Sequence, residues 1–133
     1  MTENERSIRD LYAAIESGAT GDELRRFWHP DAEQVEYPSV MRPHGHRRGL
    51  DEMIAGSELG LTMIRDQRYD VHTVVEQGDE MAVQLTWTAT VARDLGTLAA
   101  GTPLVSHVAA FYVFRDGLVL RQSSYDCYEP IAG

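Results

Sequence analysis

The sequence predicts an α+β fold, in which helices pack on one face of an antiparallel sheet. Two observations predict this class. Apolar residues recur at helical spacing through much of the first half of the chain, whereas alternating strand patterns joined by turns fill the second half. No linker or internal repeat divides the 133 residues. We therefore expect a single domain over residues 1–133.

Three helices are expected in the first half of the chain. The first spans residues 3–17, where apolar side chains form one stripe. Thr20 and Glu23 have the spacing of a capping box, which predicts a short second helix that Pro30 ends. Apolar spacing predicts the third helix at about residues 50–64. The side chains expected to be buried are Ile8, Leu11, Tyr12, Ile15, Leu24, Phe27, Trp28, Leu50, Met53, Ile54, Leu61 and Ile64.

One strand is expected between the second and third helices, at residues 33–37, where Val35 and Tyr37 fall on one face. Residues 43–49 are expected to form a loop. After the third helix the pattern predicts a meander of strands at 68–76, 81–93, 104–114 and 118–128. Both faces of this sheet carry apolar side chains, so we expect a homodimer through the sheet.

The composition excludes several classes of function. The formal charge of −9 argues against a nucleic-acid partner, because phosphate binding needs a surplus of basic side chains. All 12 basic residues are arginines, and without a lysine amine neither Schiff-base chemistry nor attachment of pyridoxal phosphate is available. The single cysteine, the polar start and the lack of a membrane-length apolar run favour a cytoplasmic protein without a membrane partner.

Five stretches of the chain are similar to those of a known superfamily. They are Leu-Tyr-Ala-Ala-Ile-Glu-Ser-Gly at 11–18, Leu-Arg-Arg-Phe-Trp-His-Pro-Asp-Ala at 24–32, His-Arg-Arg-Gly at 46–49, Val-Phe-Arg-Asp-Gly-Leu-Val at 113–119 and Ser-Tyr-Asp at 124–126. In this order they resemble the nuclear transport factor 2-like superfamily, and within it the SnoaL-like polyketide cyclases and the ketosteroid isomerase relatives. The resemblance implies a cone-shaped barrel, in which a curved antiparallel sheet wraps around the N-terminal helices and leaves a pocket at its mouth.

The residues that carry out two known reactions of the superfamily are absent from this sequence. In the ketosteroid isomerases that the chain resembles, the base and the two donors of the oxyanion hole would fall at Tyr37, Leu11 and near Ala110. The Asp-Arg-Asp set of the related epoxide hydrolases would need charged residues in the strand at 82–90, which has none. Only the last aspartate of that set has a counterpart in this sequence, which is Asp126. We therefore expect neither a typical ketosteroid isomerase nor an epoxide hydrolase.

Asp126 is the candidate catalytic residue. By strand parity it shares a face with Gln122, Ser124 and Tyr128, and the resemblance implies that this face points into the pocket. A SnoaL-like cyclase would use such a carboxyl as general acid and base, with a pKa raised by burial. The alternative is a carboxylate that holds the end of the strand. His107 is the candidate partner, although parity places it opposite Tyr112, which favours an interface or core histidine unless a bulge reverses the strand.

The remaining candidates are ligand-binding side chains for a small, flat, hydrophobic molecule. They are Tyr12, Trp28, Tyr37, Trp87, Tyr112, Gln122, Ser124 and Tyr128, with packing in the core as the alternative for the aromatics. His44 and His46 have the spacing of a metal pair but lack a third ligand, so no metal and no cofactor are expected. Parity turns Cys127 away from Asp126, and a buried inert thiol is expected there.

Two functions follow from these candidates. The first is a cofactor-independent enzyme of SnoaL-like type, an isomerase, cyclase or lyase that works by acid–base chemistry at Asp126 on a hydrophobic, oxygenated substrate. The alternative is a non-catalytic ligand-binding or accessory protein with the same pocket, supported by the missing residues of two reactions. A protein adaptor would instead need a wide, shallow apolar mouth.

Overall fold

The computed structural model describes residues 1–131, so the last two residues of the predicted 1–133 domain lie outside the described part. The helices are α1 (Glu3–Glu16), α2 (Asp22–Arg25) and α3 (Leu50–Met63). The strands are β1 (Trp28–Glu36), β2 (His46–Gly49), β3 (Ile64–Gln77), β4 (Glu80–Val91), β5 (Pro103–Arg115) and β6 (Leu118–Tyr128). The predicted α+β class is confirmed.

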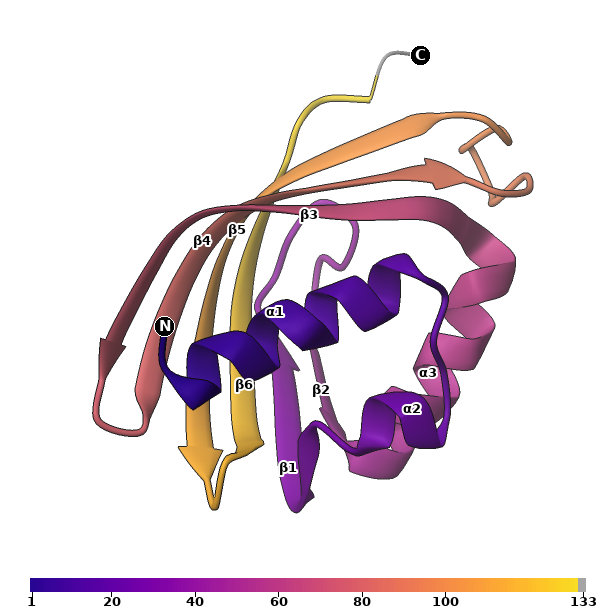
Figure 1. Ribbon diagram of the computed structural model, residues 1–133. Helices are drawn as coiled ribbons and strands as arrows, with labels where there is room; N and C mark the ends of the chain where they lie inside the picture. Colours follow the sequence, from indigo (N-terminus) through magenta and orange to yellow (C-terminus); the bar gives the residue numbers. More distant parts are fainter. Residues whose placement is uncertain (132–133) are drawn as a thin grey trace.

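The strands form one six-stranded sheet in the order β2-β1-β6-β5-β4-β3. The sheet curls around α1, and α2 and α3 lie beside its concave face (Figure 1). This is the expected cone, although its two edge strands do not close into a barrel. All neighbouring strands are antiparallel except β1 and β6, which run parallel. The hairpin pattern of the sequence did not predict this parallel pair.

Helix α1 supplies the centre of the core. The Thr2 hydroxyl accepts a hydrogen bond from the backbone N–H of Glu5 (3.1 Å) and caps the helix, whose first turn also carries the acidic Glu3. The apolar stripe expected from the sequence then faces the sheet. Its most buried side chains are Ile8, Leu11 and Tyr12, which pack with α3, β4 and β5 residues such as Met53, Val83 and Tyr112.

The second helix and the strand after it differ from the prediction. Helix α2 begins after Gly21 without a side-chain cap, so Thr20 and Glu23 form no capping box. The helix ends at Arg25, and Pro30 lies within β1 instead of ending the helix. Glycine at this N-terminus has a positive φ of 57°, a conformation in which a threonine cap would be strained.

The predicted loop at 43–49 contains a strand. Residues His46–Gly49 pair antiparallel with β1, with Arg48 opposite Gln34. A segment of four polar or small residues carries no hydrophobic period, so sequence patterning could not identify it. Leu61, expected to be buried in α3, is 42% exposed. Within residues 1–131, no helix is long and apolar enough to cross a membrane.

Candidate functional site

A cavity of about 370 Å³ lies between the helices and the concave face of the sheet. Its walls combine apolar side chains from α1 and α3 with polar side chains from β1, β2 and β6. Of the ten site residues predicted from the sequence, those that line it are Tyr12, Trp28, Trp87, Tyr112, Gln122, Ser124, Asp126 and Tyr128. The volume of this cavity and its mixture of apolar and polar lining residues are typical of a small-molecule binding site.

Strand parity explains the β6 contribution. Gln122, Ser124, Asp126 and Tyr128 alternate along β6 and all reach the cavity, opposite Tyr112, Ala110, Val108 and Ser106 of β5. The regular antiparallel register between the two strands over this stretch keeps every second side chain on the concave face. The cavity therefore has one continuous wall made of two paired strands.

Tyr37 does not line the cavity. Its ring stacks on that of Tyr125, with centroids 4.6 Å apart, and Tyr125 alternates with the cavity-facing residues of β6. Val35 and Tyr37 do share a face, as the alternation predicts, but the register of β1 turns Gln34 and Glu36 inward instead. A strand pattern alone does not say which of its two faces is concave.

His107 lies on the convex face of the sheet, away from Asp126. Its ring contacts the carboxylate of Glu129 (Nε2 to Oε2, 2.7 Å) and the hydroxyl of Thr86 (3.5 Å), and its side chain is 57% exposed. No bulge in β5 reverses the parity at this position. The structure therefore does not bring the two predicted catalytic residues together.

The carboxyl of Asp126 is half-buried in the cavity wall. Burial, and to a smaller extent the negative charge of Glu36, raise its pKa to about 6, whereas a hydrogen bond with the Ser124 side chain acts in the opposite direction. Val108, the residue directly opposite on β5, offers no polar group. The group is thus suited to exchange a proton near neutral pH.

The phenols around the cavity are neutral donors. Burial is the main cause that raises the pKa of Tyr112 and of Tyr128 to about 12, and it also raises the pKa values of Tyr12 and Tyr69. Tyr69, which sequence reasoning missed, stacks on Tyr12 with ring centroids 4.4 Å apart. All four side chains line the cavity.

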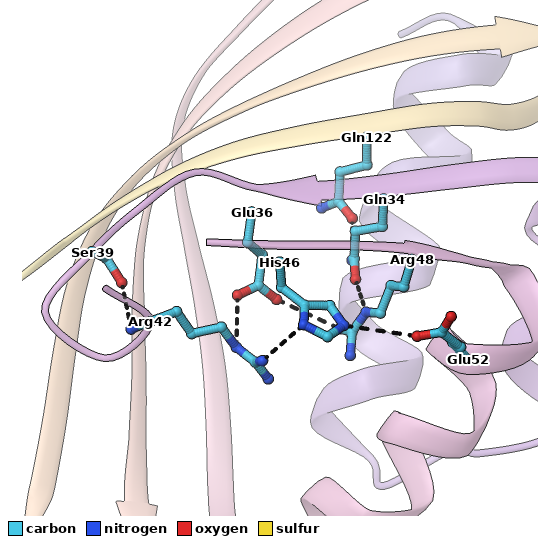
Figure 2. A network of polar contacts seen from close by, with 8 residues as sticks. All are labelled: Gln34, Glu36, Ser39, Arg42, His46, Arg48, Glu52 and Gln122. Atoms are coloured by element: carbon cyan, nitrogen blue, oxygen red, sulfur yellow. Dashed lines mark hydrogen bonds and ion pairs between the residues drawn. The ribbon is translucent and has the colours of Figure 1, made fainter. Parts of the chain in front are cut away.

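A second set of site residues, which the sequence did not identify, comes from β1, from β2 and from the turn between them (Figure 2). The guanidinium of Arg48 donates to Gln34 (2.6 Å) and pairs with Glu36 (3.5 Å), and Arg42 pairs with Glu36 at 3.2 Å. All four line the cavity. Burial lowers the pKa of Arg48, although an arginine stays charged. The neighbouring Arg47 points outward to Glu33.

The surroundings of His46 and Cys127 bear on two of the sequence-based expectations. His46 contacts Arg42 (3.3 Å) and lies 3.9 Å from Glu52, and within residues 1–131 no group of three potential ligands is positioned to hold a metal ion. Cys127 is exposed, so the prediction of a buried thiol at this position is wrong. Its position on the convex face of β6 follows from the parity that sends Asp126 inward.

A curled sheet that holds a helix and a cavity in its concave face defines the nuclear transport factor 2-like class of fold. The chain belongs to the SnoaL-like domain family, whose model matches residues 8–122. No curated protein sequence matches it.

Solved structures show the same fold. A SnoaL-like polyketide cyclase from Agrobacterium tumefaciens is 20% identical, with a TM-score of 0.72 over 95% of this chain and 92% of the other. A nuclear transport factor 2-like protein of unknown function from Burkholderia pseudomallei is 21% identical, with a TM-score of 0.76 over 95% and 92%. A Catenulispora acidiphila protein with a ketosteroid isomerase-like fold, in complex with trimethylamine, is 18% identical, with a TM-score of 0.67 over 90% and 83%.

The raised pKa of Asp126 predicts a pH-dependent cost to stability. Since the folded-state pKa of about 6 exceeds the ordinary 3.8, protonation favours the folded state. This stabilisation is complete below about pH 4 and is lost as the pH rises through about 6. Asp126→Asn should therefore be more stable than the wild type at pH 8, by about 1–2 kcal/mol after a discount for the exposed part of the carboxyl.

Urea unfolding between pH 4 and 8 measures this difference. Asp70→Asn, at a side chain 77% exposed, serves as the control and should show no comparable gain. A stability difference for Asp126→Asn that stays constant, or grows as the pH falls, would contradict the assigned environment.

Proposed function

We propose that this protein is a cofactor-independent enzyme that moves a proton on a small, hydrophobic, oxygenated substrate, with Asp126 as general acid and base. The observation that carries the proposal is the carboxyl of Asp126 in the wall of a cavity with mixed polar and apolar lining, with a pKa of about 6. At neutral pH most of the carboxyl is ionised, so it can accept a proton from carbon and return it elsewhere.

The cavity supports this chemistry in two further ways. The rings of Trp28 and Trp87 offer flat apolar surface to a ligand, and the neutral phenols of Tyr112 and Tyr128 offer donors to its oxygen atoms. A proton removed next to a carbonyl leaves an enolate, which can be reprotonated, close a ring or expel a leaving group. Isomerase, cyclase and lyase activities share this first step, and no cofactor is needed to complete it.

The family supports the same choice of chemistry. Membership of the SnoaL-like family and a structural neighbour named as a polyketide cyclase both favour an oxygenated substrate. One observation favours the alternative, a non-catalytic ligand-binding protein. His107, the expected proton-transfer partner, lies on the far side of the sheet, so it is not beside Asp126.

Proton–deuterium exchange distinguishes the two functions without knowledge of the natural substrate. We expect the wild type to accelerate exchange of the protons next to the carbonyl of 2-tetralone in D₂O, followed by proton NMR. Asp126→Asn should lose this acceleration by about 100-fold or more, because the base is removed while the cavity shape is kept. The wild-type rate should rise with pH through about 6, where Asp126 becomes ionised.

Asp70→Asn, which removes an exposed carboxylate outside the cavity, is the matched control and should retain the wild-type rate. Undiminished exchange in Asp126→Asn would contradict the proposed role of Asp126. Binding of 2-tetralone to the wild type without any exchange would favour the ligand-binding alternative.

We also propose that the protein is a homodimer through the convex face of its sheet. Phe111 and Tyr125 are 48% and 47% exposed there and contact each other edge to face, with Tyr37 stacked beside them. Exposed aromatic clusters of this kind are commonly covered by a partner. Light scattering should show a dimer for the wild type and a monomer for Phe111→Glu. Val40→Glu, at a 75% exposed loop residue, should remain dimeric; a monomeric wild type would contradict the proposal.

A further inference from the structure

A continuous chain of hydrogen bonds crosses the cavity wall from β2 to α1. Arg48 Nε donates to Gln34 Oε1 (2.6 Å), and Gln34 Nε2 donates to Gln122 Oε1 (2.5 Å). Gln122 Nε2 then donates to the Tyr112 hydroxyl (3.1 Å), which lies 2.5 Å from the Tyr12 hydroxyl. Figure 2 shows the first part of this chain, from Arg48 through Gln34 to Gln122. We call these five residues the relay.

Four residues of the relay lie opposite one another on neighbouring strands, and the fifth, Tyr12, comes from α1. Arg48 is directly opposite Gln34 in the register of β2 and β1, and Gln34 is directly opposite Gln122 across the parallel pair. Gln122 is in turn opposite Tyr112 of β5. Because the backbone pairing of the strands fixes which residues lie opposite one another, it also fixes which side chains are in contact.

The direction of the relay follows from its first member. A guanidinium donates hydrogen bonds and cannot accept them, so the amide oxygen of Gln34 must face Arg48. The amide nitrogen of Gln34 then faces Gln122 and requires an acceptor there, which places the Gln122 oxygen toward it. The Gln122 nitrogen is left to donate to Tyr112. Arg48 thus sets the orientation of two amides and makes the Tyr112 oxygen an acceptor.

One phenolic proton remains at the end of the relay. Tyr12 and Tyr112 hold two O–H groups, and only one of them can serve the bond between the two oxygens. Among residues 1–131, neither hydroxyl has a further protein acceptor within hydrogen-bond distance. Both side chains line the cavity, so the second proton is directed to whatever occupies it.

We infer that the relay makes the tyrosine end of the cavity a hydrogen-bond donor that selects an acceptor group of the ligand, such as a ketone, quinone or ester carbonyl. Arg48, Gln34 and Gln122 are positioning residues that act through Tyr112. The inference rests on the proposed function only for the presence of an oxygenated ligand, and it requires no proton transfer by Asp126. A ligand with an ammonium group at this end would bind poorly, because both the ammonium and the phenol are hydrogen-bond donors.

Reversal of the relay tests the inference. In Gln34→Glu, the carboxylate accepts from Arg48 and also from the Gln122 nitrogen, so the Gln122 amide turns over. Its oxygen then accepts the Tyr112 proton, Tyr112 accepts the Tyr12 proton, and no phenolic proton is left for the ligand. The substitution keeps the shape of the side chain. Gln122→Glu has the same effect by accepting from Gln34 and Tyr112 together.

The readout is the infrared carbonyl band of bound 2-tetralone labelled with ¹³C at its carbonyl carbon. In the wild type we expect this band at lower frequency than for the ketone in an apolar solvent, because the carbonyl accepts a phenolic hydrogen bond. In Gln34→Glu and Gln122→Glu the band should return toward the apolar-solvent position, and affinity should fall about 10-fold. Circular dichroism checks that each variant is folded, and either variant alone suffices.

The matched control is Gln67→Glu. Gln67 also lines the cavity, but its oxygen accepts from the Trp87 indole (3.1 Å), so the substitution adds the same charge without touching the relay. Its carbonyl band should stay at the wild-type position. The low-frequency band should also persist in Asp126→Asn, which separates this inference from the proposed function. An unshifted band in the wild type, equal bands in wild type and Gln34→Glu, or no binding of the ketone to the wild type would overturn the inference.

Discussion

The parallel pairing of β1 with β6 is the contact on which the candidate site depends. It begins where the Val119 N–H donates to the Phe27 carbonyl (3.0 Å) and ends where the Tyr37 N–H donates to the Ser124 carbonyl (3.0 Å). Between these bonds the register sets Gln34 opposite Gln122. The pairing also carries β2 along the outer side of β1, so that the strand segment 46–49 contributes to the cavity.

This strand arrangement places charged side chains in the partly buried wall of the cavity, where desolvation destabilises them. Glu36 and Asp126 both face the cavity, and two arginines, Arg42 and Arg48, pair with Glu36 alone. Asp126 thus remains without an arginine partner among the described residues, and burial acts on its pKa unopposed by a salt bridge. Folding tolerates a destabilised carboxylate here because the apolar core of α1, β4 and β5 supplies the stability.

The sequence predicted the parts of the site that depend on local alternation. Turns at Gly78 and Gly117 define the long hairpins, and period-two alternation within β6 then places Asp126 on the same face as Gln122. It could not predict the parts that depend on non-local pairing. Tyr37 was assigned to the cavity because a pattern does not identify the concave face, and Arg48 was assigned to a loop because four residues show no period. The position of Tyr37 depends on the β1–β6 register and that of Arg48 on the pairing of β2 with β1, and no local signal encodes either.

The proposed chemistry requires that the half-buried carboxyl of Asp126 exchanges a proton near neutral pH. Its pKa can be measured directly by following the side-chain carboxyl ¹³C resonance in labelled protein between about pH 3 and 9, with the resonance assigned by its loss in Asp126→Asn. We expect a midpoint of about 6 in the ligand-free protein. A midpoint at or below the ordinary aspartate value of about 4 would contradict it.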